Sequence, residues 1–343
     1  MNKNPDVTLI LFSYNQEKYI DEALNGVLSQ SYEPLEIIIS DDCSRDNTFN
    51  VIKNRSDNYH GPHNILAIQN ESNIGVVEHI NKLMSIASGD IIIIAAGDDI
   101  SSNNRVAVLV ESFIRNPNIY AVCSNASYID SSGELGGLYF KGNYGIYNKY
   151  EMAKQGISFV FGAALSWRRE IFDKFGPLPT NVRNEDQIIP FRAALLGDVL
   201  VIPDVLVKYR EHENNLSFWS KMKSGTIVEC LKNRRLQINN LICNYQEWLK
   251  NVNEIGYNLS VKDLLTIQNS INKNIQILGQ EDELLINKIY NRAKIYISIK
   301  SELNLKFTVL YAIIVISPKL YALMLKNKIL IRNILAIGKK YNK

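Results

Sequence analysis

The stretch LEIIISDDCSRDNT (Leu35–Thr48) joins an apolar run, two adjacent acids and the start of a helical pattern. The run Leu35–Ser40 is short, rich in β-branched residues and followed by turn-forming residues, which is typical of a buried strand. From Asp46 to Asp57 the pattern becomes helical. Because adjacent carboxylates repel each other, Asp41-Asp42 is either a solvated turn or a place where function requires negative charge.

The same alternation of strand and helix continues on both sides of this stretch. Further strands are expected at Val7–Ser13, Asn64–Gln69, Asp90–Ala96 and Tyr120–Ser124, and helices at Glu17–Gln30, Val76–Ser88 and Asn103–Arg115. Near-continuous apolar strands that alternate with helices predict an α/β fold with a mostly parallel, Rossmann-like sheet and flanking helices. The fully apolar run Asp90–Ala96 is expected at its centre.

Polar residues follow three of the predicted strands directly: Ser13-Tyr14-Asn15, Asp41-Asp42 and Gly97-Asp98-Asp99. Ligands of such sheets bind beyond the carboxyl ends of the strands, so these side chains are expected at one ligand-binding edge. The acids after Gly97 are oxygen ligands suited to Mg²⁺ or Mn²⁺, and a divalent ion would offset their repulsion. The alternative is a Gly-Asp-Asp turn that caps a helix beginning at Asn103.

Two further motifs lie outside this alternation. Asn184–Gln187 contains the pair Glu185-Asp186, and a carboxylate there can act as a general base toward a substrate hydroxyl. The alternative is an ordinary helix N-terminus with favourable acids in its first turn. The segment Tyr209–Ser217 contains His212, which is either a third metal ligand or phosphate contact, or a histidine of a surface loop.

Charge is divided unevenly along the 343 residues. The net charge is +3, but eight basic and no acidic residues follow Glu302, so the preceding part carries −5. A body of that sign is a poor nucleic-acid binder. The four cysteines show neither CxxC nor zinc-site spacing, which indicates a reducing compartment. The N-terminal residues lack the pattern of a signal peptide, and together these features predict a cytoplasmic protein.

The basic tail requires its own interpretation. Its apolar run Phe307–Ser317 is interrupted by Pro318 and Lys319 before the roughly 20 apolar residues of a membrane span are reached. The mixture of basic, tyrosine and aliphatic residues over 305–343 fits peripheral helices on an anionic membrane surface. The alternative is a buried helix that packs on the rest of the chain or on a second subunit of a homodimer. Two regions are thus expected, 1–217 and a helical, basic 218–343.

The order of these motifs resembles that of the inverting family 2 glycosyltransferases, which have the GT-A fold. The resemblance covers residues 6–217 and depends on four segments: Val7–Thr48, Asn73–Ile100, Asn184–Asp186 and Tyr209–Ser217. It implies transfer of a sugar from a UDP- or dTDP-linked donor to a hydroxyl of a lipid-linked saccharide, in the synthesis of a bacterial-type surface polysaccharide. The implied cofactor is Mn²⁺ or Mg²⁺, and the implied location is the inner face of the cell membrane.

The resemblance also implies a role for each motif. The nucleotide-sugar site would comprise the first-strand motif, the acid that reads uracil or thymine with its neighbour, and the final acid of the DxD element: Ser13, Tyr14, Asn15, Asp41, Asp42 and Asp98. The metal ligands would be Asp98, Asp99 and His212. The catalytic base would be Asp186, with Glu185 as its pair partner.

The sequence departs from the family pattern at three places. The DxD element reads Ala96-Gly97-Asp98, so its first acid is missing, and metal binding would rely on the remaining ligands. Cys43 stands where many members have glycine. The segment Gln187–Phe191 does not supply the QxxRW motif of processive synthases, which predicts transfer of a single sugar rather than polymer extension.

Other functions remain open at this point. A catalytically degenerate partner in an assembly complex is favoured by Ala96 and disfavoured by the intact Glu185-Asp186 pair. A nucleotidyltransferase also uses paired acids, but it would need a basic, glycine-rich phosphate loop, which Ser13–Tyr19 lacks. No GxGxxG follows the first strand, which disfavours an NAD-dependent enzyme.

Overall fold

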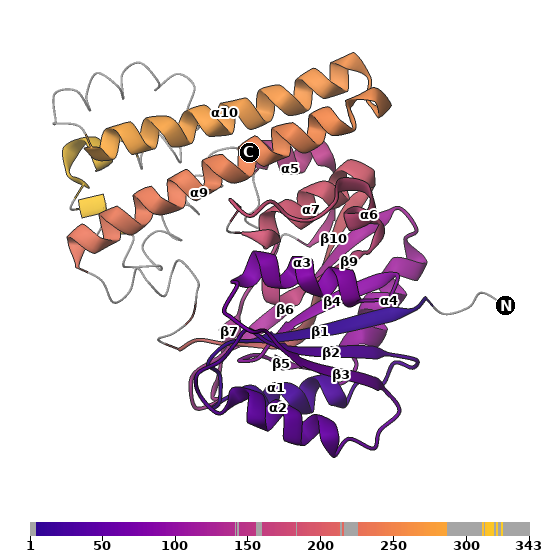
Figure 1. Cartoon of the computed structure of the whole chain (residues 1–343). Helices are drawn as coiled ribbons and strands as arrows, with labels where there is room; N and C mark the ends of the chain where they lie inside the picture. The colour runs from indigo at the N-terminus through magenta and orange to yellow at the C-terminus, as the bar shows by residue number, and fades with distance from the viewer. Residues whose placement is uncertain are drawn as a thin grey trace. The chain divides into compact units, whose positions relative to one another are not determined.

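The computed structural model describes residues 5–140, 142, 144–155, 160–182, 184–212, 215, 226–286, 311, 313–318, 320, 321 and 324. The first part of the chain forms a mixed α/β domain built on a ten-stranded sheet (Figure 1). The main strand order is β3-β2-β1-β4-β9-β6-β10-β5, with β7 paired to β6 and β8 to β10. The strands are β1 (Val7–Ser13), β2 (Glu36–Asp41), β3 (Asn64–Gln69), β4 (Ile91–Ala96), β5 (Ile100–Ser101), β6 (Ile119–Ile129), β7 (Leu135–Leu138), β8 (Gly145–Tyr147), β9 (Leu165–Arg168) and β10 (Asp198–Arg210).

The first four strands of this order form the parallel half of the sheet. β1 pairs in parallel with both β2 and β4, and β2 pairs in parallel with β3. β9 then enters antiparallel between β4 and β6, and β6 pairs in parallel with β10. The predicted mostly parallel sheet is therefore confirmed, with β4 near its centre, and the antiparallel strands are additions to the prediction.

Helices cover both faces of the parallel half. The helices of this domain are α1 (Ile20–Leu28), α2 (Thr48–Asp57), α3 (Val76–Ile86), α4 (Arg105–Arg115), α5 (Lys149–Gln155), α6 (Glu170–Phe175) and α7 (Glu185–Leu196). Of these, α7 packs on β6, β9 and β10, and α5 and α6 contact α7. Apolar residues of α1, α2 and α4 pack against alternate residues of β1, β2 and β4, which form the core. The other face of these strands is equally buried, and α3 lies on that side (Figure 1). Burial on two faces explains why these strands are continuous apolar runs.

Each predicted strand and helix of the first 124 residues is present, with ends shifted by a few residues. The largest difference is β6, which runs to Ile129 because its second half pairs with β7 and β10 rather than ending in a loop. The segment 126–215, which the sequence indicates only as less regular, contributes β7 to β10 and α5 to α7.

Two long helices, α9 (Ile227–Glu254) and α10 (Val261–Ile286), confirm the predicted helical C-terminal region. The chain divides into two compact units: the first comprises 1–211 with 247–270, and the second comprises 212–246 with 271–343. The boundary at 217 remains a prediction. No helix in the part of the chain that the structure describes has the length and apolar character required to cross a membrane. Most of the tail 305–343 lies outside the described residues.

Candidate active site

The carboxyl ends of β1, β2 and β4 bring the three predicted strand-end motifs to one edge of the sheet. In the register of the parallel pairs, Ser13 lies opposite Asp41 and Phe12 lies opposite Ala96. The backbone N–H of Asp42 donates to the Ser13 carbonyl at 2.9 Å, which continues the pairing beyond the strands. The motifs are therefore neighbours in space, at the edge where open α/β sheets bind ligands.

Asp41 is completely buried, and its carboxylate is held from several sides. Oδ2 accepts hydrogen bonds from the backbone N–H of Ser44 at 2.8 Å and from Nε2 of Gln69 at 3.0 Å. Oδ1 accepts from the hydroxyls of Ser44 and Ser13, the latter at 3.3 Å. These contacts fix the orientation of the carboxylate, and its role in reading a pyrimidine base remains a prediction.

Asp42 anchors the loop that leads into α3. Its Oδ1 accepts from Nδ2 of Asn70 at 2.8 Å and from the backbone N–H of Ile74 at 3.0 Å, and its Oδ2 accepts from the N–H of Gly75 at 2.9 Å. Gly75 is the N-cap of α3 and has a φ of +79°, a conformation that glycine adopts without strain. A carboxylate at this position also interacts favourably with the helix dipole. The sequence did not indicate this anchoring contact.

The loops after β1 and β2 are joined to each other through Asn15. Its side-chain Oδ1 accepts from the backbone N–H of Arg45 at 2.8 Å, and its own N–H donates to the hydroxyl of Ser44 at 2.8 Å. Asn15 and Cys43 both have positive φ, at +53° and +62°. The left-handed backbone at Cys43 is one that glycine adopts most easily, which explains why glycine suits this position. Tyr14 is exposed beside this junction.

The two acids after β4 have different surroundings. Asp98 is half-buried, whereas Asp99 is buried and accepts a hydrogen bond on Oδ1 from the backbone N–H of Arg210 at 2.9 Å. Its Oδ2 is buried without a hydrogen-bond partner among the described residues. Burial, followed by the nearby charge of Asp98, raises the pKa of Asp99 well above its usual range.

Asp98 and Asp99 alone do not supply the three side-chain ligands of a complete protein metal site. No three His, Cys, Asp or Glu side chains of the described ranges lie close enough together to hold an ion. His212 opens the second compact unit, so its role as a ligand remains a prediction. The donor set that remains, chiefly Asp98, fits an ion that a nucleotide diphosphate helps to hold, since Mg²⁺ commonly uses one or two carboxylates together with substrate phosphates.

Glu185 and Asp186 form the first turn of α7 and lie against Gly162. A Cβ atom built on Gly162 would lie 3.1 Å from Oε1 of Glu185 and 3.3 Å from Cβ of Asp186, so only glycine fits there without movement. The backbone of Gly162 also hydrogen-bonds the Asp186 carboxylate. Oδ1 of Asp186 is buried and has no hydrogen-bond partner in the described part of the chain.

Burial changes the protonation of this acidic pair. It raises the pKa of Asp186 to about 6, and burial together with the charge of Asp186 raises the pKa of Glu185 to about 8. The two carboxyls titrate as a pair that holds about one proton at neutral pH. A carboxylate whose pKa lies near the working pH, with an oxygen that lacks a partner, is suited to accept a proton from a bound hydroxyl.

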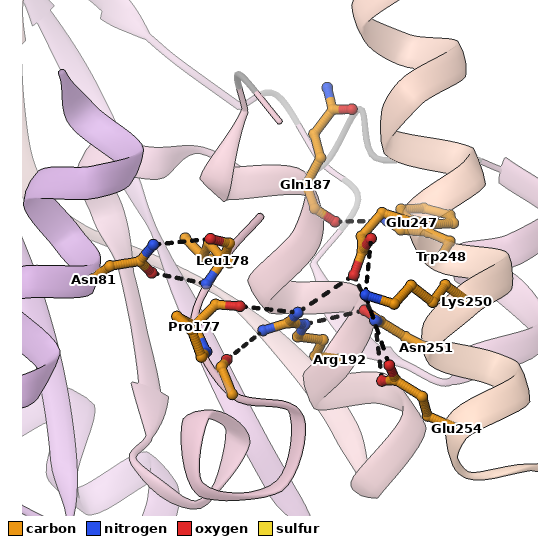
Figure 2. A network of polar contacts seen from close by, with 11 residues as sticks. Asn81, Pro177, Leu178, Gln187, Arg192, Glu247, Trp248, Lys250, Asn251 and Glu254 are labelled. Atoms are coloured by element: carbon orange, nitrogen blue, oxygen red, sulfur yellow. Dashed lines mark hydrogen bonds and ion pairs between the residues drawn. The ribbon is translucent and has the colours of Figure 1, made fainter. Parts of the chain in front are cut away.

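The helix α7, which begins with Glu185 and Asp186, packs against α9 (Figure 2). Trp248 stacks on Phe191 with ring centroids 3.9 Å apart, and its Nε1 donates to the carbonyl of Gln187 at 3.0 Å. Pro190 lies inside α7 and has no N–H to donate to the carbonyl of Asp186, which weakens the first turn. The Trp248 contact therefore supports the turn where the helix is weakest.

A second contact between α7 and α9 involves a buried arginine (Figure 2). Nε of Arg192 donates to Oδ1 of Asn251 at 3.0 Å, and its guanidinium lies 3.5 Å from Glu247. It also donates to the backbone carbonyl of Gly176 at 2.8 Å. The sequence did not indicate either contact, because the partners are about 60 residues apart.

Comparison with known proteins identifies the family to which the first half of the chain is similar. Residues 8–176 match the family model described as glycosyl transferase family 2. EpsE of Bacillus subtilis, provisionally named a glycosyltransferase, is 32% identical over 136 residues, which are 40% of this chain and 48% of EpsE. Residues 8–176 therefore form a glycosyl transferase family 2 domain, and the family predicted from the motifs is confirmed.

Solved structures with a similar fold cover nearly the whole chain. TarS from S. aureus, in a crystal structure with UDP-GlcNAc, superposes with a TM-score of 0.56 at 14% identity, over 94% of this chain and 90% of that one. The mannosyltransferase PcManGT from Pyrobaculum calidifontis, with GDP-Man and Mn²⁺, gives a TM-score of 0.52 at 15% identity, over 95% and 88%. These likenesses show the GT-A fold. The chain spans 60% of the length of the mycobacterial relatives that it matches at 27% identity.

Proposed function

We propose that the chain is an inverting glycosyltransferase that moves a single sugar from a UDP- or dTDP-linked donor to a hydroxyl of a lipid-linked saccharide. The observation that carries this proposal is Asp186, a carboxylate of raised pKa with a buried oxygen that has no partner in the described part of the chain, next to a family 2 domain. The pathway we infer is the synthesis of a surface polysaccharide. The absence of QxxRW from Gln187–Phe191 favours a single transfer.

Asp186 is assigned as the general base. The acceptor oxygen attacks the anomeric carbon from the face opposite the nucleotide, and the hydroxyl proton passes to the carboxylate of Asp186. The bond between the anomeric carbon and the diphosphate oxygen breaks as the new bond forms, and its electron pair leaves with the diphosphate. Because attack and departure occur on opposite faces, the configuration is inverted.

Ser13, Tyr14, Asn15, Asp41, Asp42 and Asp98 are assigned to the donor. Both oxygens of Asp41 already accept hydrogen bonds, and the longest is that from Ser13 at 3.3 Å. A carboxylate offers about four acceptor positions, so a base N–H would replace this weak contact. A uridine donor is supported by the UDP-GlcNAc named for the TarS structure, whereas the GDP-Man of PcManGT makes GDP the natural competitor to test.

The cofactor we propose is Mn²⁺ or Mg²⁺. Asp98 would hold it, with Asp99 and His212 as further ligands, and the ion would neutralise the charge that develops on the departing diphosphate. The Mn²⁺ named for PcManGT supports this assignment. The location we propose, peripheral at the inner face of the membrane, depends on the basic residues of 305–343.

A second candidate remains, a catalytically degenerate partner in an assembly complex. The observation that favours it is Ala96, which replaces the first acid of the DxD element. In keeping with that change, the described residues contain no group of three potential metal ligands.

A nucleotide panel measured by thermal unfolding separates these candidates. UDP, dTDP, GDP, ADP and CMP are each added with and without Mn²⁺, because a ligand that binds only the folded protein raises the melting temperature. A metal-dependent rise with UDP or dTDP alone supports the proposed donor class. A rise with GDP alone would contradict the uridine assignment, and no rise with any nucleotide would favour the degenerate partner.

A further inference from the structure

Four aromatic rings gather at the carboxyl ends of β6 and β10, outside the residues assigned so far. Tyr128 near the end of β6 and Tyr209 near the end of β10 are direct partners in the parallel register. Tyr139, just after β7, stacks on Phe161 with centroids 4.0 Å apart and on Tyr128 at 5.4 Å. Tyr209 meets Phe161 edge to face at 4.9 Å. We call these four residues the aromatic cluster.

The aromatic cluster adjoins both the acidic pair and the turn after β4. Phe161 directly precedes Gly162, which contacts Glu185 and Asp186, and the charge of Asp186 contributes to the raised pKa of Tyr139. On its other side, Tyr209 directly precedes Arg210, whose Nε donates to the carbonyl of Asp98 at 3.0 Å. The cluster therefore adjoins residues that contact the acidic pair and residues that contact the turn of Asp98.

The aromatic cluster does not form a closed hydrophobic core, because most of its rings are partly exposed to solvent. Phe161 is 8% exposed, but Tyr128, Tyr139 and Tyr209 are each half-buried. The chain beside Tyr139 is held by Asn125, whose Oδ1 accepts from the N–H of Phe140 at 2.9 Å. Partly exposed rings on a fixed backbone can present apolar surface and phenolic hydroxyls to a ligand.

The chemistry of such a surface matches a sugar ring. One face of a pyranose consists of C–H groups, which carry partial positive charge and pack on the negative face of an aromatic ring. The hydroxyls around the sugar can exchange hydrogen bonds with tyrosine O–H groups. Oδ1 of Asp186 is buried and has no hydrogen-bond partner among the residues that the structure describes, so it can accept from one sugar hydroxyl.

We infer that the aromatic cluster is the acceptor subsite and holds the terminal sugar ring of a saccharide acceptor, with one of its hydroxyls directed to Asp186. This inference rests on the proposed function, because it takes Asp186 as the base. It adds to that function the residues that hold the acceptor: the sugar ring that receives the new sugar lies on the aromatic cluster, where a bare lipid phosphate would not bind.

The test measures sugar binding and nucleotide binding separately on the whole chain. Methyl glycosides of glucose, galactose and N-acetylglucosamine are titrated by saturation-transfer NMR, and farnesyl phosphate is the probe for a bare lipid phosphate. Tyr128→Leu and Tyr209→Leu should weaken glycoside binding about tenfold, since each removes one aromatic face. Tyr209→Phe keeps the ring and should bind within about threefold of the parent protein.

Tyr257→Leu is the matched control, because Tyr257 is 72% exposed and lies in the turn after α9, outside the cluster. It should leave glycoside binding unchanged, and all variants should keep the melting-temperature rise with nucleotide. Glycoside binding that is equal in the parent and both leucine variants overturns the inference. So does binding of farnesyl phosphate with no glycoside signal. Cluster-dependent glycoside binding without any nucleotide response would refute the proposed function and leave the subsite standing.

Discussion

The backbone N–H of Arg210 lies 2.9 Å from Oδ1 of Asp99, and this contact joins the end of β10 to the turn after β4. The Arg210 side chain strengthens the connection, because its Nε donates to the carbonyl of Asp98 and its Nη2 pairs with Glu22 at 2.9 Å. Its guanidinium also lies over the ring of Tyr19, 4.8 Å from the centroid. One buried arginine thus holds the turn that carries the proposed metal-binding acid.

Replacing this arginine should affect both stability and ligand binding. Arg210→Met removes the buried guanidinium that donates to the Asp98 carbonyl and to Glu22, and it should lower the free energy of unfolding by about 3 kcal/mol, which urea denaturation measures. It should also reduce the melting-temperature rise with UDP and Mn²⁺. Arg55→Met is the control, because Arg55 forms an exposed ion pair with Asp21 and its loss should cost at most about 1 kcal/mol. Equal effects of the two substitutions would contradict the assigned role of Arg210.

Asp186→Asn tests the proposed base without a change of shape. The amide cannot accept the acceptor's proton, so turnover should fall by about 10²-fold or more. UDP binding, measured by thermal shift, should remain close to that of the parent protein, because the donor residues are untouched. Loss of nucleotide binding to the same extent as turnover would show that Asp186 supports the fold or the donor instead.

The raised pKa of Asp186 predicts a pH dependence with a definite sign. The base works when it is ionised, so the rate should increase as the pH rises through about 6. For stability the sign is opposite: the folded protein binds this proton more tightly than the unfolded chain, so ionisation of Asp186 costs stability as the pH rises toward 6. Asp186→Asn should therefore be more stable than the parent protein at pH 8 and lose that advantage at pH 4.

A rate that falls between pH 5 and 7 would contradict this assignment of the base. So would an Asp186→Asn variant that is less stable than the parent protein at pH 8. Both readouts are needed, since Glu185 titrates with Asp186 and a rate profile alone reports the pair.

The first 124 residues were predictable because their strands are short, apolar and separated by turns, which is a local signal. β9 and β10 were not, because their place in the sheet depends on pairing with β4 and β6, far away in sequence. β10 is also irregular where it pairs with β6, with register shifts between Val201 and Val207. A local pattern contains no information about which distant strand will pair.

In the candidate site, too, some features could be predicted from local sequence and others depend on residues far away in the chain. The sequence predicted that Asp41 and Asp42 stand at the edge of the sheet formed by the carboxyl ends of the strands, and the pairing of β1 and β2 places them at that edge. It could not indicate that Asp42 anchors the loop at Asn70 and Gly75, since those donors lie 28 and 33 residues away. Motif order is thus readable from sequence, whereas the hydrogen bonds that orient each acid depend on the folded loops.

Substitutions of Trp248 test how much the packing of α9 against α7 contributes to stability (Figure 2). Trp248→Ala removes a fully buried ring that stacks on Phe191, and it should lower the free energy of unfolding by about 3–5 kcal/mol. Trp248→Phe keeps an aromatic ring but removes the indole N–H that donates to the carbonyl of Gln187, so it should cost about 1–2 kcal/mol. Urea denaturation followed by circular dichroism measures both, and a phenylalanine variant as unstable as the alanine variant would contradict a separate role for the hydrogen bond.

Ala96→Asp tests whether the missing acid limits metal binding. Ala96 is half-buried at the end of β4, two residues before Asp98, so an aspartate there adds a carboxylate at the edge of the sheet. In the absence of metal the variant should be less stable than the parent protein, because the added charge is repelled by its acidic neighbours. With Mn²⁺ and UDP its melting temperature should rise more than that of the parent, because an ion offsets the repulsion and gains an oxygen ligand. Ala96→Asn is the matched control, since it has nearly the same shape without the charge. If the aspartate and asparagine variants respond equally to Mn²⁺, a carboxylate at position 96 is not a ligand of the ion, and the missing acid does not limit metal binding.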